Sequence, residues 1–286
     1  MLTTETQVDA GHAIQPAGCH LTLSGDLRVR AASANIAKQL SASAAACLGR
    51  TMAELLLPDT VHDMRNRMAL LREEGTVEHL FGCQLVDGAE PVDLSIYRAG
   101  DGFGVDIECP VDQRFGDATG LIEGMLARLN PGNDLNALAT AGASQLRSLT
   151  GYDGVSIHLR GQMIGRSGRG PTPPELAAAT AEIPFMVIDR AAEPVAIITA
   201  GRDDCAIVRS ELRASSPDEA QWLDSAGAKA AFLFPLASEG EILGHASCIS
   251  ARPRHISPKR RGVAKLFGTL VALRLQVAEL RSLRSG

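Results

Sequence analysis

The sequence predicts an α+β protein of two domains, each an antiparallel sheet flanked by helices, followed by a long C-terminal helix. Its 286 residues are too many for one ordinary compact domain and suit two. In both halves, short segments with alternating apolar residues, which are typical of strands, are interspersed with segments of helical spacing. From Ser257 to Leu280, a helix-start signal is followed by apolar residues that recur every three or four positions, which is typical of one long helix.

Composition narrows the class of protein. A net charge of −5 argues against general nucleic-acid binding, and an aromatic content of 3% leaves few rings for stacking on bases. The longest apolar run, Ala230 to Ala237, is far shorter than the roughly 20 residues of a membrane span. The N-terminus has no secretion signal, and the six cysteines form no C-x-x-C pair. We therefore expect a cytoplasmic protein that binds neither nucleic acid nor membrane.

The first half begins with a predicted hairpin around the turn at residues 24–26, where Leu21 and Leu23 face Leu27 and Val29. Ser33 is expected to cap the first helix. The helices predicted next are Ala34–Leu40, Met52–Leu57 and Val61–Glu74, and the strands are Val77–Val86, Val92–Tyr97 and Gly102–Glu108.

The second half is expected to begin with a helix over Leu121–Leu129 and another over Leu135–Leu149, which Gly151 ends. A strand follows at Val155–Leu159. The segment Arg160–Gly170 reads as a Gly/Arg loop, whose arginines either hold a phosphate or carboxylate or form a solvated hairpin end. The remaining elements predicted before the C-terminal helix are a short helix over Pro171–Thr180 and strands over Ala230–Leu236 and Ile242–Ser250.

Several motifs resemble those of bacterial phytochromes. In the first half, two strands, three helices and three strands follow one another as in a PAS domain. AIQPAG (13–18) resembles the phytochrome Ile-Gln-Pro-His-Gly motif, and AASANIAKQL (31–40) resembles its Ala-Ser-Ala-Asn helix start. In the second half, LTGYD (149–153) resembles the opening of the phytochrome GAF domain. LRASSPDEAQWL (212–223) resembles Leu-Arg-x-x-Ser-Pro-x-His-x-x-Tyr-Leu.

The resemblance runs from about Ala10 to about Leu283 and implies a PAS–GAF sensory module. The expected parts are an N-terminal segment 1–20, a PAS domain 21–116, a linker helix 117–134, a GAF domain 135–257 and a C-terminal helix 258–286. One option for the N-terminal segment is that it threads through the GAF domain.

Phytochromes sense light with a bilin, a linear tetrapyrrole, so the resemblance also implies a pocket. The positions that match it here are Glu182, Ile183, Pro184, Arg213, Ser216, Glu219, His158 and Ile249. Several of them depart from the family. Glu219 and Ile249 replace two pocket histidines, His158 replaces a tyrosine, and Glu182 replaces an aspartate. The chain has no cysteine before Cys19 to attach the pigment, whereas Arg213 keeps a propionate-binding arginine.

These departures predict a module without covalently bound bilin, and with no cofactor, that senses another ligand or acts through protein contacts. The alternative is a photoreceptor that holds biliverdin noncovalently. In that case Glu219 would balance the positive charge of the pyrrole rings, and Arg213 would bind a propionate of the pigment. The chain carries no catalytic motif that we can identify, so we expect no enzyme activity in it. A histidine kinase or cyclase output would lie outside it, and the chain is either a sensory fragment or a stand-alone regulator.

The C-terminal helix carries two further predictions. Its apolar residues form a heptad-like seam that predicts a homodimer, with a downstream signalling protein or output domain as the other partner. The residues expected at the dimer interface are Leu266, Leu270, Leu273, Val277 and Leu280. Basic residues cluster from Arg252 to Arg261, and they either form a solvated face or serve an anionic partner.

Overall fold

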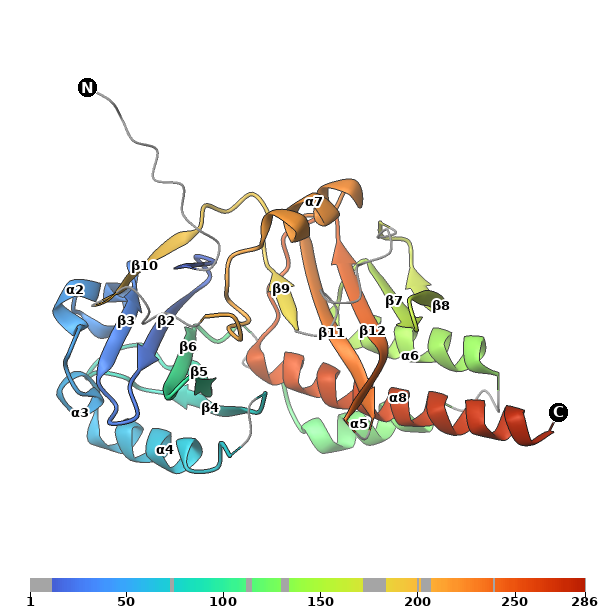
Figure 1. Ribbon diagram of the computed structural model, residues 1–286, viewed down its shortest axis with the longest axis horizontal. Coiled ribbons are helices and arrows are strands. Elements are labelled where there is room, and N and C mark those ends of the chain that lie inside the picture. The colour runs from blue at the N-terminus through green and yellow to red at the C-terminus, as the bar shows by residue number, and fades with distance from the viewer. Residues whose placement is uncertain are drawn as a thin grey trace, which may run out of the picture. The chain divides into compact units, whose positions relative to one another are not determined.

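The chain forms two compact units that are discontinuous in sequence. The computed structural model describes residues 12–72, 75–111, 115–129, 134–171, 184–199, 201, 207–238 and 240–285. The N-terminal unit combines residues 1–110 with 191–217, and the C-terminal unit combines 111–190 with 218–286. Each has one antiparallel sheet and helices, which confirms the predicted α+β class (Figure 1). Residues 191–217, which fall inside the range expected for the GAF domain, thus belong to the first unit.

The sheet of the N-terminal unit has seven strands in the order β1-β10-β3-β2-β6-β5-β4. They are β1 (Ala13–Ile14), β2 (Gly18–Leu23), β3 (Val29–Ser33), β4 (Val77–Cys83), β5 (Val92–Ala99), β6 (Gly102–Glu108) and β10 (Val195–Thr199). Leu21 pairs with Ala32, so the predicted hairpin is confirmed. Strand β10 was not predicted, and it inserts between β1 and β3.

Four helices follow β3, and their apolar side chains share one core with the sheet. They are α1 (Ala37–Leu40), α2 (Ala44–Cys47), α3 (Met52–Leu55) and α4 (Pro58–Met68). Ile36, Cys47 and Met64 from this region pack in a cluster with Leu21 and Ile96 of the strands. The burial of these residues explains why short helices of only one turn persist here.

Two predictions for this region were wrong in detail. Ser33 does not cap a helix: it pairs with Ile197 of β10, and its hydroxyl accepts a hydrogen bond from the His20 N–H at 2.9 Å. The helix expected from Val61 to Glu74 begins earlier, because Pro58 occupies its first turn, and ends at Met68. Proline suits this position because it has no N–H to leave unpaired.

Among the described residues, the sheet of the C-terminal unit has five strands in the order β8-β7-β12-β11-β9. The strands are β7 (Gly154–Leu159), β8 (Gln162–Gly168), β9 (Phe185–Val187), β11 (Ala230–Ser238) and β12 (Glu241–Ser250). The described helices of this unit are α5 (Ala118–Ala127), α6 (Leu135–Thr150), α7 (Pro217–Ser225) and α8 (Pro258–Ser285). Asp134 caps α6 by accepting hydrogen bonds from the N–H groups of Asn136 and Ala137. Gly151 ends α6 with a φ of 68°, as its position after the last apolar residue predicted.

The segment Arg160–Gly170 is not a loop as predicted, because Gln162–Gly168 pair with β7 as strand β8. Arg160 and Gly161 make the tight turn between the two strands, both with positive φ. The short helix expected over Pro171–Thr180 lies, after its first residue, outside the described residues.

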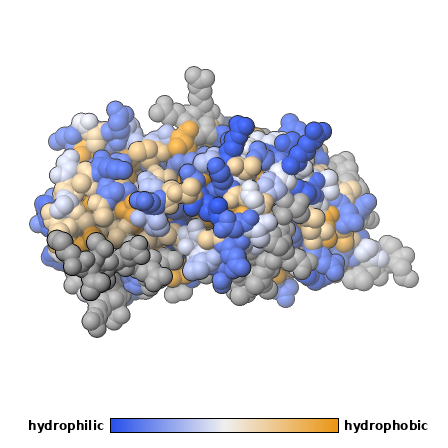
Figure 2. Space-filling view, turned by 90° about the horizontal axis from the view of Figure 1, so that it is seen from above, coloured by the Kyte–Doolittle hydropathy of each residue, from blue (hydrophilic) through white to orange (hydrophobic). Residues whose placement is uncertain are grey.

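None of the described helices combines the length and the apolar content that a membrane crossing needs. On the face drawn in Figure 2, hydrophobic residues are scattered among hydrophilic ones.

Candidate ligand-binding site

The candidate site is one face of the sheet in the C-terminal unit. The other face is covered by helices: Gly142 of α6 lies against Ile157, and Gly268 of α8 lies against Phe234, with no room for a Cβ atom at Gly268. Successive side chains of a strand point to opposite faces. The residues on the face away from these helices are therefore Ser156 and His158 of β7, Ala231 and Leu233 of β11, and His245, Ser247 and Ile249 of β12.

Two histidines stack on this face. His158 and His245 are directly opposite each other on β7 and β12, with ring centroids 4.4 Å apart and ring planes 12° apart. Nε2 of His158 lies 3.0 Å from the Ser156 hydroxyl. Both rings are buried, and burial together with the neighbouring His158 ring lowers the pKa of His245 to about 4. His245 is therefore uncharged near neutral pH.

An apolar cluster covers the adjoining part of the same face. Ile249 packs there with Leu233 of β11, Phe185 of β9 and two residues of α7, Trp222 and Leu223. The Trp222 and Phe185 rings meet edge to face, with centroids 6.1 Å apart. Trp222 is the most exposed of these five, at 7%. Close packing of this kind leaves little space for a ligand against Ile249.

The predicted pocket residues are distributed over both units. His158 and Ile249 lie on the same sheet face, and buried Glu219 lies on α7, the helix that brings Trp222 to Ile249. Pro184 is half-buried directly before β9. Glu182 and Ile183 lie outside the described residues.

Arg213 and Ser216 belong to the N-terminal unit. The backbone of Arg213 bridges to Ile14, and its carbonyl accepts a hydrogen bond from the Gln15 side chain at 3.1 Å. The Ile-Gln-Pro segment and the Leu-Arg segment, almost 200 positions apart, therefore lie side by side within that unit.

Sequence reasoning missed His245, Phe185 and Trp222 as residues of this face. The alternation of side chains along a strand could have found His245, because it lies four residues before Ile249 on β12 and therefore on the same face of the sheet. In the part of the chain that the structure describes, no three His, Cys, Asp or Glu side chains gather in a way that could hold a metal ion.

Comparison with known families matches both halves of the chain. The model described as "PAS fold" matches residues 3–110, and the model described as "GAF domain" matches residues 134–275. Both are sensory domains. A comparison with curated protein sequences returned no match.

Solved structures of bacteriophytochromes share the fold. The photosensory core module of Stigmatella aurantiaca phytochrome superposes with a TM-score of 0.79 at 21% identity, over 98% of this chain and 61% of that one. A bacteriophytochrome from R. palustris superposes with a TM-score of 0.81 at 19% identity, over 96% of this chain and 60% of that one. The chromophore-binding domain of the Stigmatella protein (Thr289His mutant) superposes with a TM-score of 0.78 at 20% identity, over 94% of this chain and 98% of that one.

The chain thus spans about three fifths of the length of the two longer structures and nearly all of the chromophore-binding domain. It consists of a PAS domain followed by a GAF domain in the fold that bacteriophytochrome photosensory structures share.

Proposed function

We propose that this chain is the sensory module of a signalling protein, that it holds no bilin, and that it acts through protein contacts made by α8. The apolar cluster around Ile249 carries the proposal. The similar Stigmatella structure is a chromophore-binding domain, so a bilin is the ligand against which the residues of this chain are compared.

The described residues of the sheet face do not fit a bilin. A linear tetrapyrrole presents ring N–H groups, carbonyls and two propionates, and each such group buried without a partner costs about 1 to 3 kcal/mol. Ile249 offers no hydrogen bond, and Phe185, Leu233 and Trp222 occupy the space beside it. His158 and His245 stack on each other. Residues 1–18 contain no cysteine that could stand at the position of the phytochrome anchor.

An absorption spectrum tests this part of the proposal. The full chain is produced together with heme oxygenase, and the Stigmatella photosensory core is produced in the same way as a positive control. We expect no absorption band at long wavelength from this chain and a strong one from the control, because the apolar cluster excludes the pigment.

A long-wavelength band that photoconverts would contradict the proposal. If that band disappeared on denaturation with no pigment retained on the chain, noncovalent biliverdin binding, the alternative reading, would replace it.

The second part of the proposal rests on the two apolar faces of α8, a helix of 28 residues. One face is buried within the unit and includes Phe267, Val271 and Leu275. The other carries the predicted seam, in which Leu270 is half-buried and the remaining side chains are exposed: Leu266 (51%), Leu273 (38%), Val277 (42%) and Leu280 (55%).

The spacing of the seam favours a second copy of the same helix as its cover. Its residues alternate steps of four and three, which is the pattern that two helices bury between them in a coiled coil. An identical seam on each copy also satisfies the symmetry of a two-fold dimer. A dimer through α8 would present the end of the helix to a downstream output domain or signalling protein.

A further inference from the structure

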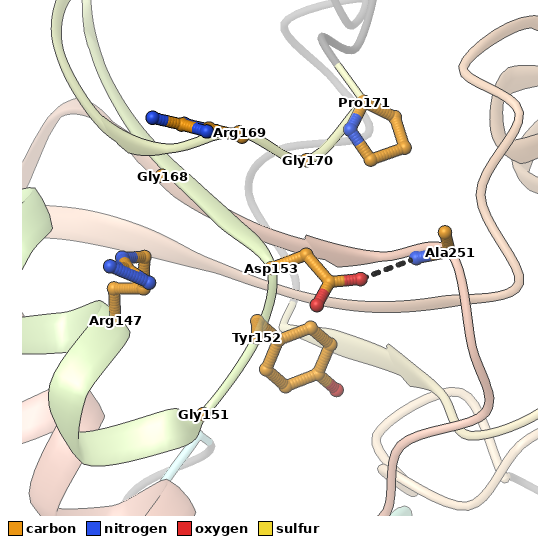
Figure 3. Close-up of a pocket in the computed structure, with 9 residues that line it drawn as sticks. All are labelled: Arg147, Gly151, Tyr152, Asp153, Gly168, Arg169, Gly170, Pro171 and Ala251. Atoms are coloured by element: carbon orange, nitrogen blue, oxygen red, sulfur yellow. Dashed lines mark hydrogen bonds between the residues drawn. The ribbon is translucent and has the colours of Figure 1, made fainter.

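A polar hollow in the C-terminal unit lies apart from the sheet face described above. Its volume is about 560 Å³, and it lies where α6 ends, β7 begins and β8 ends (Figure 3). Arg147 and Gly151 line it from α6, Asp153 from the start of β7, and residues 168–171 from the end of β8. This volume is within the range of about 300 to 1,000 Å³ found for small-molecule sites.

The wall of the hollow is made of closely packed backbone. A Cβ atom on Gly168 would lie 2.1 Å from the carbonyl oxygen of Asp153, and one on Gly170 would lie 2.7 Å from the N atom of Gly154. Gly168 also has a φ of 94°, which other residues rarely adopt. Glycine is therefore required at both positions, and neither of them places a side chain in the hollow.

Hydrogen bonds hold the segment after β8 in place. Arg166 donates to the carbonyl oxygens of Gly170 and Pro171, and Arg160 is held away from the hollow by an ion pair with Glu279 on α8. Of the three arginines between Arg160 and Gly170, Arg169 alone lines the hollow.

The hollow has an excess of positive charge. Arg147 and Arg169 are both exposed, and within the described part of the chain neither forms an ion pair. Nε of Arg147 donates to the Ser167 hydroxyl at 3.3 Å. The guanidinium of Arg254 lies against Gly151, where a Cβ atom would be 3.3 Å from its nitrogen.

The one carboxylate of the hollow is already engaged. Asp153 accepts hydrogen bonds from the Ala251 N–H at 2.9 Å and the Ser250 hydroxyl at 2.8 Å. These bonds, followed by Arg254 and Arg252, lower the pKa of Asp153. Figure 3 shows its carboxylate turned toward Ala251, while the side chains of Arg147 and Arg169 lie on the other side of the strand.

The negative end of α6 is likewise compensated. A helix C-terminus repels anions because its last carbonyl groups are unpaired. Here Arg260 donates to the carbonyl of Leu149, and the Gly151 N–H donates to that of Arg147. A cation therefore sits at the end of the helix that would otherwise disfavour an anion.

We propose that this hollow binds the phosphate group of a small anionic molecule, with Arg147 and Arg169 as its direct contacts. Two guanidinium groups from different elements can donate to different oxygens of a tetrahedral anion, which suits phosphate better than a single planar carboxylate. The only aromatic ring that lines the hollow in the described residues, Tyr152, is buried, so recognition rests on the charged group and not on stacking. The proposal does not depend on the function proposed above.

Calorimetric titration of the full chain with sodium pyrophosphate tests this proposal, with ionic strength held constant and citrate as a carboxylate of comparable charge. We expect saturable binding of pyrophosphate that is tighter than that of citrate. Arg147→Gln and Arg169→Gln should each weaken it about tenfold, because each removes charge-assisted hydrogen bonds. Both side chains are exposed, so we expect the variants to keep the thermal midpoint of the parent chain.

The matched control is Arg65→Gln, which removes an exposed arginine from α4 in the other unit and should leave the affinity unchanged. Three results would overturn the proposal: no saturable pyrophosphate binding, an equal affinity for citrate, or an affinity that the double variant Arg147→Gln/Arg169→Gln retains.

Discussion

The stacked pair of His158 and His245 is the residue-scale feature with the clearest physical consequence. Each ring is nearly inaccessible to water, and the two lie in contact on neighbouring strands. A proton placed on His245 would sit in a region of low dielectric constant beside a second imidazole. Folding therefore favours the neutral form of His245.

The free energy of unfolding should consequently fall as the solution is acidified. An exposed histidine has a pKa near 6.5, whereas that of His245 in the folded chain is about 4. Between these two values the unfolded chain binds a proton that the folded chain does not, so stability decreases as pH falls, by about 3 kcal/mol in total. Trp222, the single tryptophan, lies in this unit, so its fluorescence during urea unfolding at pH 7, 6 and 5 measures the effect.

The variant His245→Leu should lose most of this pH dependence. His62→Leu, which changes an exposed histidine on α4, should keep it. An equal slope in His245→Leu and the parent chain would show that another group is responsible.

At the scale of elements, α8 is the feature that most directly predicts behaviour in solution. Its buried face needs no partner beyond its own unit, whereas the seam from Leu266 to Leu280 remains in contact with water in a single copy. Apolar side chains that recur along one stripe of a helix are costly to leave exposed, since burying each contributes about 1.5 to 3 kcal/mol.

We expect the parent chain to have twice its chain mass of 30.1 kDa in light scattering. The double variant Leu273→Asp/Leu280→Asp should be monomeric, because two copies would bring four carboxylates into an apolar seam. Leu70→Asp places the same change on a leucine that is 60% exposed outside α8, and it should remain dimeric. A monomeric parent chain would exclude the α8 dimer.

Elements with strong local signals could be predicted from sequence, and elements defined by distant partners could not. The spacing of apolar residues and Gly151 predicted a helix over Leu135–Leu149, and α6 ends one residue later, at Thr150. Ser33 has the local chemistry of a helix cap, but pairing with Ile197 keeps it in a strand. No local pattern shows that residues 195–199 complete a sheet whose other strands come from the first 108 residues.

The same distinction applies to the candidate site. The motif resemblance placed His158, Glu219 and Ile249 near one another in the fold, whereas their actual neighbours depend on packing. Trp222 was visible only as a substitution within a motif, and its contact with Phe185 requires α7 and β9 to meet in space. A prediction based on motifs alone therefore names candidate positions and not the side chains that surround them.

At the scale of the whole molecule, the N-terminal unit depends on residues that follow much later in the chain. A buried polar network fixes them: the Ser210 hydroxyl donates to both carboxylate oxygens of Asp106, at 2.8 and 2.9 Å, and Asp106 lies 2.8 Å from Nδ1 of His20. All three side chains are buried. Residues 191–217 therefore supply both strand β10 and one of the partners of a buried carboxylate.

A fragment of residues 1–110 should accordingly be less stable than one in which residues 191–217 are appended through a short Gly/Ser linker. Without β10, the strands β1 and β3 lose their shared partner, and Asp106 keeps a buried carboxylate with fewer hydrogen bonds. Thermal unfolding followed by circular dichroism compares the two. Ser210→Ala in the longer fragment should lower its stability by about 1 to 3 kcal/mol.

Equal melting temperatures for the two fragments would show that the first 110 residues form an independent unit, and that the contacts of residues 191–217 add nothing to its stability.

The position of β10 also constrains how the protein is made. During translation, the strands up to β6 leave the ribosome before the strand that must insert between β1 and β3 has been synthesised. At usual elongation rates this delay is on the order of ten seconds, during which the edge of β3 is open to pairing with other chains. The nascent chain therefore has to keep that edge protected until most of the second unit has emerged.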